Sequence, residues 1–274
     1  MESHTVTLGR TPYHYIEWSN PGKPKMVLLH GMKVEAHCWQ EVSDVLKADF
    51  HIYALDLKGH GKTAHGTVHD PDYTPAQISS ELKEFYDNVI QEPFHIAGYS
   101  LGGQYAMNYA ALYPGTLKSL ILLDTAPEIS LLGVFFLMVL GGSRNRVFPS
   151  KAEFIAKYEK HGMEKIGRYM AEYTLKARSD GKYEYRFDEQ NLAPKTSREY
   201  RARVKELWED MRTIQVPTIF LVAEKSQIVS SRILRKMKQA MPKIEITTVP
   251  KVGHEMVFSA PQFIAGTLRQ RLAD

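Results

Sequence analysis

The stretch of sequence that decides the fold is Ile96-Ala97-Gly98-Tyr99-Ser100-Leu101-Gly102-Gly103. It follows a short apolar run typical of a buried strand and opens a segment with helical periodicity. Glycines two residues before and two residues after a serine are the pattern of a sharp strand-to-helix turn that holds the serine in strained geometry. Larger side chains at those two positions would collide. The pattern predicts that Ser100 is a nucleophile, although taken alone it also fits an ordinary glycine turn.

The composition suits one large α/β domain, or such a domain with an insertion. The chain has 274 residues, of which 43% are hydrophobic, so it can bury a sizeable core. The formal net charge is +4, and the lysines and arginines are scattered along the chain. Lys33, Lys58 and Lys62 are neighbours of the predicted site in sequence but do not form a phosphate-binding stripe. We therefore expect no nucleic-acid partner.

The cysteine content and the absence of targeting patterns favour a cytoplasmic protein. The lone cysteine, Cys38, excludes an internal disulfide and suits a reducing compartment. Met1-Glu2-Ser3-His4 lacks the positive start and apolar run of a signal peptide. The most apolar run, residues 129–140, is too short to span a membrane. The sequence leaves open the possibility that the protein forms a homodimer.

Strand-like and helix-like segments alternate over most of the chain, which is typical of a mainly parallel sheet covered on both faces. Residues 5–8 and 14–18 alternate in polarity and predict an antiparallel hairpin at the sheet edge. The expected inner strands are residues 26–29, 51–55, 94–97, 118–123, 218–222 and 245–249, and the expected helices are residues 40–46, 75–89, 103–111, 231–240 and 261–272.

The alternation breaks between Pro127 and Arg212, where the pattern predicts helices at residues 130–140, 151–160, 165–176 and 197–211. We therefore expect a core domain of residues 1–126 and 213–274, with a helical cap of residues 127–212. Such a cap over Ser100 would enclose an apolar pocket. The aromatic and apolar residues predicted to contact substrate there are Trp39, Tyr99, Phe135, Phe136 and Met138.

Over nearly its whole length the sequence resembles the α/β-hydrolase fold superfamily, in particular its serine hydrolases with a helical cap. The segments that carry the resemblance are Leu29-His30-Gly31-Met32, Asp56-Leu57-Lys58-Gly59-His60-Gly61-Lys62, Gly98-Tyr99-Ser100-Leu101-Gly102-Gly103, Leu122-Leu123-Asp124 and Gly253-His254. The resemblance implies an α/β fold with a mostly parallel eight-stranded sheet flanked by helices. It also implies that the backbone N–H groups of Met32 and Leu101 form an oxyanion hole.

His254 is the predicted general base. It follows the last expected strand and precedes the final helix, which gives the chain order serine, acid, histidine expected of this fold. An imidazole suits the role because its unperturbed pKa lies near the operating pH. The chain has 11 histidines, so position rather than residue type carries this prediction.

The position of the predicted acid differs from the one most common in the superfamily that the sequence resembles. The usual aspartate would fall after the expected strand 218–222, where the chain has Ser226 and Gln227. Some members of the superfamily carry the acid at the end of the preceding strand, and that position is Asp124. We therefore predict Asp124 as the acid. Glu224 is a second candidate, and Asp124 could instead cap its own loop and leave the pair without a proper acid.

The predicted function is hydrolysis of an apolar carboxylic ester, lactone or thioester through an acyl-enzyme on Ser100. The same scaffold also hosts carbon–carbon and amide bond hydrolases. A ligand receptor or signalling protein with little turnover is an alternative from another class, kept open by Ser226 and Gln227. The histidines lack paired metal-ligand spacing and no phosphate-binding glycine loop is present, so we expect no metal and no cofactor.

Overall fold

The computed structural model describes residues 1–64, 73–130, 133, 147–188 and 196–272. Its body is an eight-stranded sheet, which confirms the expected fold. The two N-terminal strands form an antiparallel hairpin at one edge, the second also pairs antiparallel with β4, and the remaining pairs are parallel. In spatial order the strands are β1 (Glu2–Leu8), β2 (Thr11–Trp18), β4 (His51–Leu55), β3 (Lys25–Leu29), β5 (Phe94–Tyr99), β6 (Leu117–Leu123), β10 (Thr218–Ala223) and β11 (Glu245–Val249).

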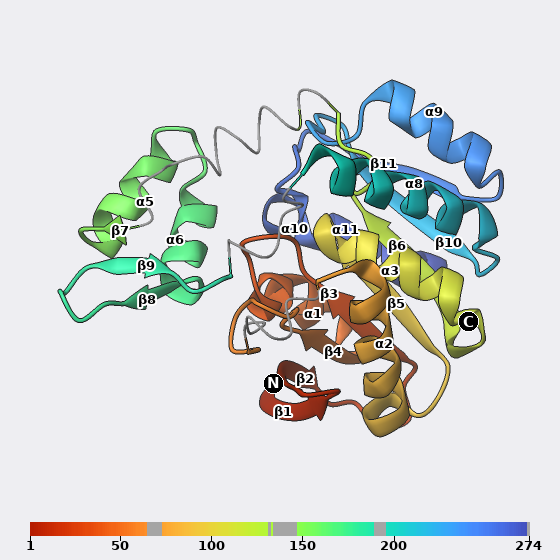
Figure 1. The fold of residues 1–274 in the computed structure, drawn as a ribbon, viewed down its shortest axis with the longest axis horizontal. Helices are drawn as coiled ribbons and strands as arrows, with labels where there is room; N and C mark the ends of the chain where they lie inside the picture. Colours follow the sequence, from red (N-terminus) through yellow and green to blue (C-terminus); the bar gives the residue numbers. More distant parts are fainter. Residues whose placement is uncertain (65–72, 131–132, 134–146, 189–195, 273–274) are drawn as a thin grey trace.

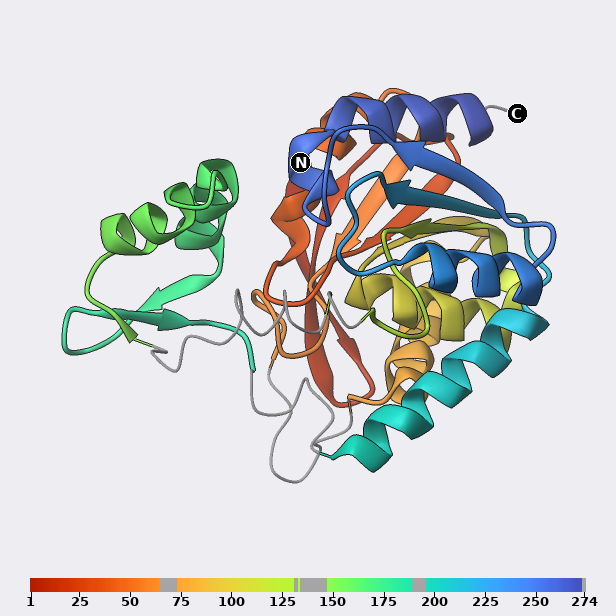
Figure 2. The ribbon, with the colours of Figure 1, turned by 90° about the horizontal axis from the view of Figure 1, so that it is seen from above.

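The inner strands are apolar on both faces because helices cover both. Every residue of β4 and of β5 is buried, as expected of strands in the middle of a covered parallel sheet. Figure 2 shows α11 on one face of the sheet and α3, α8 and α9 on the other. The helices of the body are α1 (Gln40–Leu46), α2 (Pro75–Phe85), α3 (Leu101–Leu112), α8 (Ser197–Thr213), α9 (Ser231–Ala240), α10 (Met256–Ser259) and α11 (Pro261–Leu272), with short turns η1 (Ala36–Trp39), η2 (Tyr86–Ile90) and η3 (Pro114–Thr116).

Hydroxyl side chains fix where several helices begin. Thr74 precedes α2, Thr196 precedes α8 and Ser230 precedes α9, and each side-chain oxygen accepts a hydrogen bond from an N–H of the first helical turn. Such caps satisfy backbone donors that have no partner inside the helix, and each contributes about 1 kcal/mol. The expected starts of these three helices agree with the structure.

The region expected to form a helical cap contains two helices and also a small sheet. Helices α5 (Lys151–Glu159) and α6 (Glu164–Tyr173) form, but they pack on a three-stranded antiparallel sheet of β7 (Val147–Phe148), β9 (Tyr183–Tyr185) and β8 (Leu175–Ala177). Aromatic rings join the two layers, because the ring centroid of Phe154 on α5 lies 4.8 Å from that of Phe148 and 5.9 Å from that of Tyr185. The predicted helix 130–140 falls almost wholly outside the described residues.

Helix α8 was expected in the cap, but it packs on the sheet body. Its buried residues Leu207, Trp208 and Met211 share one face, and the last two belong to the core between the sheet and α3. The predicted boundary at residue 212 therefore lies too far along the chain, and α8 belongs with the body. Among the described residues, no helix combines the length and the apolar character that a membrane crossing requires.

We expect Met211→Ala to destabilise the sheet body. The Met211 side chain is fully buried, so its truncation leaves a cavity and costs about 2–5 kcal/mol of unfolding free energy. Arg201→Ala, at an exposed position of the same helix, should change the free energy of unfolding by less than about 0.5 kcal/mol. Urea denaturation, monitored by tryptophan fluorescence, measures the free energy of unfolding of both variants. Equal stability of the two variants would show that α8 does not belong to the cooperative core.

Candidate functional site

Ser100 sits in a strained turn that only its glycine neighbours permit. Its backbone has φ 52° and ψ −115°, between the end of β5 and the first residue of α3. A Cβ atom at Gly98 would lie 2.4 Å from the Gly102 carbonyl oxygen, and one at Gly102 would lie 2.4 Å from the Leu29 carbonyl oxygen. Both approaches are far below van der Waals contact, so the sterics expected from the sequence are present in the structure.

His254 lies between Ser100 and Asp124. Its Nε2 is 3.0 Å from the Ser100 hydroxyl oxygen, and its Nδ1 is 2.8 Å from Oδ2 of Asp124. Asp124 follows β6 and is fully buried, so its carboxylate holds the proton on Nδ1. Nε2 then has its lone pair directed at the serine hydroxyl. The structure thus brings together the three residues predicted as nucleophile, base and acid.

The residues at the usual acid position support Asp124 instead of replacing it. The Ser226 hydroxyl donates to Oδ2 of Asp124 at 2.9 Å, and the Ala223 N–H donates to Oδ1 at 3.1 Å. With Nδ1 of His254 this makes three donors, which a buried carboxylate needs to offset its lost hydration. Oε1 of Gln227 accepts the His254 backbone N–H at 3.2 Å. From sequence alone Ser226 and Gln227 indicated only a missing acid, although their polar character was a signal of this supporting role.

Glu224, the other candidate acid, is exposed and lies elsewhere. Its carboxylate accepts the backbone N–H of Lys251 at 2.6 Å. It therefore fixes the loop that precedes His254 and does not contact the imidazole in this structure. Thr125 is a further supporting residue that the sequence did not indicate, because its hydroxyl donates to the Ser100 carbonyl at 2.7 Å.

Tyr99 and Trp39 were predicted to contact substrate, and the structure places both inside the core. Trp39 is fully buried in the layer beneath α1 and α11, so its prediction as a pocket wall is wrong. Tyr99 is 6% exposed, and its hydroxyl donates to the His254 carbonyl at 2.8 Å. Burial raises the pKa of the Tyr99 hydroxyl well above its usual value, so it remains a donor. Phe135, Phe136 and Met138 lie outside the described residues.

The loop after β3 carries Met32 and is fixed by two buried histidines. His30 accepts the Leu57 N–H at Nε2 (2.9 Å) and donates from Nδ1 to the Gly31 carbonyl at 2.7 Å. Burial lowers its pKa, which keeps the ring neutral. Nε2 of His60 accepts the Lys33 N–H at 3.3 Å. These bonds hold the backbone on both sides of Met32, while Leu101 is the first residue of α3.

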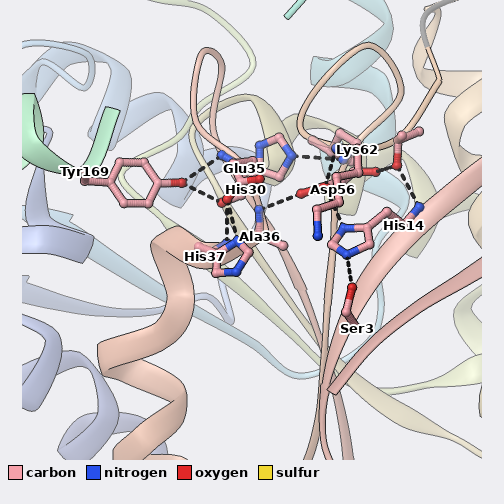
Figure 3. A network of polar contacts seen from close by, with 11 residues as sticks. Ser3, His14, His30, Glu35, Ala36, His37, Asp56, Lys62 and Tyr169 are labelled. Atoms are coloured by element: carbon pink, nitrogen blue, oxygen red, sulfur yellow. Dashed lines mark hydrogen bonds and ion pairs between the residues drawn. The ribbon is translucent and has the colours of Figure 1, made fainter. Parts of the chain in front are cut away.

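Asp56 anchors the next part of the same loop (Figure 3). Oδ1 of this fully buried carboxylate accepts the Ala36 N–H at 2.8 Å. Oδ2 accepts the Lys62 N–H at 2.8 Å and contacts Nδ1 of His14 at 2.7 Å. Burial alone would raise the pKa of Asp56, but the hydrogen bonds and the nearby histidines bring it below its usual value. Asp56 therefore joins three segments as an anion.

A cavity of about 370 Å³ lies on the seam between cap and body. It is lined by both charged and aromatic side chains, among them His37, Glu41, Lys165, Tyr173 and Phe258. Within the part of the chain that the structure describes, no three histidine, cysteine or acidic side chains form a metal-binding group.

Comparison with known proteins identifies the family of this chain. The family model described as serine aminopeptidase, S33, matches residues 20–260, and the chain belongs to this family of α/β hydrolases. The chain is 25% identical over 268 residues to the monoacylglycerol lipase ABHD6 of Homo sapiens, covering 92% of this chain and 77% of that protein. It is 22% identical over 251 residues to the N-formylmaleamate deformylase of Pseudomonas putida, covering 88% and 85%.

A solved structure shows the same fold at lower sequence identity. The crystal structure of E-2-(acetamidomethylene)succinate hydrolase superposes with a TM-score of 0.85 at 20% identity, covering 100% of this chain and 99% of that one. The sheet body and the cap therefore follow an arrangement already seen in a hydrolase.

We expect Asp124→Asn to slow covalent labelling of Ser100 by a fluorophosphonate probe by about 10⁴-fold. An amide at this position favours the wrong imidazole tautomer and cannot stabilise the imidazolium. Glu224→Gln is the matched control and should label at the wild-type rate. Labelling is followed by gel fluorescence over time. A normal rate for Asp124→Asn, or a large loss for Glu224→Gln, would refute the assignment of the acid.

Proposed function

We propose that this protein is a serine hydrolase that cleaves a carboxylic ester, lactone or thioester with an apolar acyl group. The observation that carries the proposal is the relay in which His254 contacts the Ser100 hydroxyl at 3.0 Å and the Asp124 carboxylate at 2.8 Å. A nucleophile within hydrogen-bond reach of a base that a third group orients is the arrangement that activates a serine.

The relay divides hydrolysis into two steps. His254 takes the Ser100 proton at Nε2 as the serine oxygen attacks the carbonyl carbon, and Asp124 stabilises the resulting imidazolium. The imidazolium then gives its proton to the leaving alcohol or thiol, and the acyl group remains on Ser100. A water activated by His254 releases the acid and restores the serine. The net reaction consumes one water for each bond cleaved.

Two backbone donors would stabilise the tetrahedral intermediates. In this proposal the N–H groups of Leu101 and Met32 face the carbonyl oxygen as it becomes negative. The position of Leu101 at the start of α3 supports this, because a helix N-terminus favours negative charge. Each donor in such a site contributes about 3 kcal/mol to the transition state. The loop bonds around Met32 supply the required rigidity before substrate arrives.

An acyl ester is the substrate class that the relatives favour, since one is a monoacylglycerol lipase. Amide hydrolysis is the second candidate, because another relative is a deformylase of an N-formyl compound. The receptor alternative rested on the polar residues at positions 226 and 227. The carboxylate that Asp124 presents to His254 supports turnover instead.

A panel of p-nitrophenyl esters of graded acyl length, with p-nitroanilides of the same acyl groups, tests the proposal. We expect turnover of the esters with a preference for medium chains, because an apolar acyl group gains binding energy with each buried methylene. The Ser100→Ala variant should show no turnover of these esters. Stopped-flow release of p-nitrophenolate separates acylation from deacylation.

Each other outcome contradicts one part of the proposal. One burst without further cycles would identify a receptor-like protein that acylates and stalls. Preference for the anilides would replace the ester by an amide as substrate. No activity on the panel, together with no fluorophosphonate labelling of Ser100, would reject the serine hydrolase itself.

A further inference from the structure

The hydroxyl of Tyr169 makes two hydrogen bonds to one residue of the sheet body (Figure 3). It accepts the Glu35 backbone N–H at 3.0 Å and donates to the Glu35 carbonyl at 3.0 Å. Tyr169 lies on α6 of the cap, whereas Glu35 follows Met32 by three residues in the loop after β3. The cap is therefore bonded to the loop that carries the proposed oxyanion donor.

Groups of the body hold the neighbouring backbone of the same loop. The Lys33 N–H donates to His60, and the Ala36 N–H donates to Asp56. Backbone groups outside helices and strands need such partners when they are buried. At Glu35, by contrast, the partner of the N–H comes from the cap. The loop geometry thus depends on a residue that lies 134 positions away in the sequence.

Further residues of the cap contact this loop on either side of Glu35. The Lys33 ammonium lies 6.0 Å and 5.6 Å from the ring centroids of Tyr185 and Phe187. The His37 ring stacks on Tyr173 with centroids 4.3 Å apart. The cap therefore contacts the body at several points of one loop, which we call the oxyanion loop and define as residues 30–37.

The Tyr169 ring is held independently of its hydroxyl. Its centroid lies 4.9 Å from that of Phe258 and 5.2 Å from that of Tyr173. A phenylalanine would keep this packing and lose only the two hydrogen bonds. Burial raises the pKa of the Tyr169 hydroxyl well above its usual value, so the group stays protonated and able to donate.

We propose that Tyr169 is a positioning residue through which the docked cap sets the geometry of the oxyanion loop. This inference rests on the proposed serine hydrolase function. Tyr169 does not touch the reacting atoms in this account. It acts on Met32 through the backbone of Glu35, so the cap contributes to the chemical step as well as to substrate enclosure.

The expected effect is on kcat more than on KM. An oxyanion donor binds the negative charge of the transition state more strongly than the ground-state carbonyl, so its misplacement lowers kcat. A shift of about 1 Å in a catalytic group can cost about 100-fold in rate. Because His60 and Asp56 still hold the loop on both sides, we expect a smaller loss of about 10-fold in Tyr169→Phe.

The experiment compares the full-length wild type, Tyr169→Phe and Tyr183→Phe on the preferred p-nitrophenyl ester. Tyr183 lies on β9 of the cap, so its variant loses a tyrosine hydroxyl at another place in the cap and should stay within 2-fold of wild type. For Tyr169→Phe we expect kcat to fall about 10-fold with KM changed by less than 2-fold.

Inhibitor binding separates positioning from a merely structural role. An alkyl trifluoromethyl ketone forms an oxyanion on the serine, so Tyr169→Phe should bind it about 10-fold more weakly. The matching methyl ketone, which resembles the ground state, should bind both proteins equally. Unchanged kcat and unchanged trifluoromethyl ketone affinity, even with a lower melting temperature, would overturn the proposal and leave Tyr169 a structural residue.

Failure of the proposed function gives a different result. If the wild type turns over no ester or anilide, the proposed function fails while Tyr169 can still be tested. Fluorophosphonate labelling of Ser100 also builds negative charge on an oxygen in the oxyanion hole. A labelling rate in Tyr169→Phe about 10-fold below wild type would uphold the positioning role, and an equal rate would reject it.

Discussion

The buried carboxylate of Asp124 is the constraint on which the rest of the site depends. It is fully buried, and a charge without hydration must be matched by donors. Those donors come from the end of β10, from the loop after it and from His254. One anion therefore ties together segments that follow three different strands. The imidazole is held in one tautomer, and its other ring nitrogen faces the Ser100 hydroxyl.

The parallel sheet is what brings these segments together. The oxyanion loop follows β3, Ser100 follows β5, Asp124 follows β6, the Ser226 loop follows β10, and His254 follows β11. These five strands are consecutive neighbours in the sheet. Their carboxyl ends share one edge, so residues distant in sequence meet without a long connection, as ligand sites in open α/β sheets generally do. The oxyanion loop is one of the places where the cap contacts this edge.

Much of the body could be predicted, because buried parallel strands and capped helices leave local signals. Ser100 and His254 were predicted from motif and position, and Asp124 from its place at the end of the strand that precedes the usual acid loop. The small sheet of the cap was missed because its strands of two or three residues are too short to show a period. Trp39 was predicted as a pocket wall but lies in the core, since aromatic character does not tell a pocket wall from a core residue. Ser226 was interpreted only as the absence of an acid, because Asp124, its hydrogen-bond partner, is distant in the sequence.

Backbone strain is concentrated where the site is. Among the described residues other than glycine, five have positive φ, and four of them, Lys33, Ser100, Asp124 and Lys251, lie in loops at the carboxyl edge. Such conformations cost about 1–3 kcal/mol each and persist only where surrounding contacts enforce them. Replacement by glycine would relieve the backbone strain at these positions. An effort to raise thermal stability would thus find its most obvious targets at the residues where activity has most to lose, and the useful gains must be sought on the helices of the outer layers.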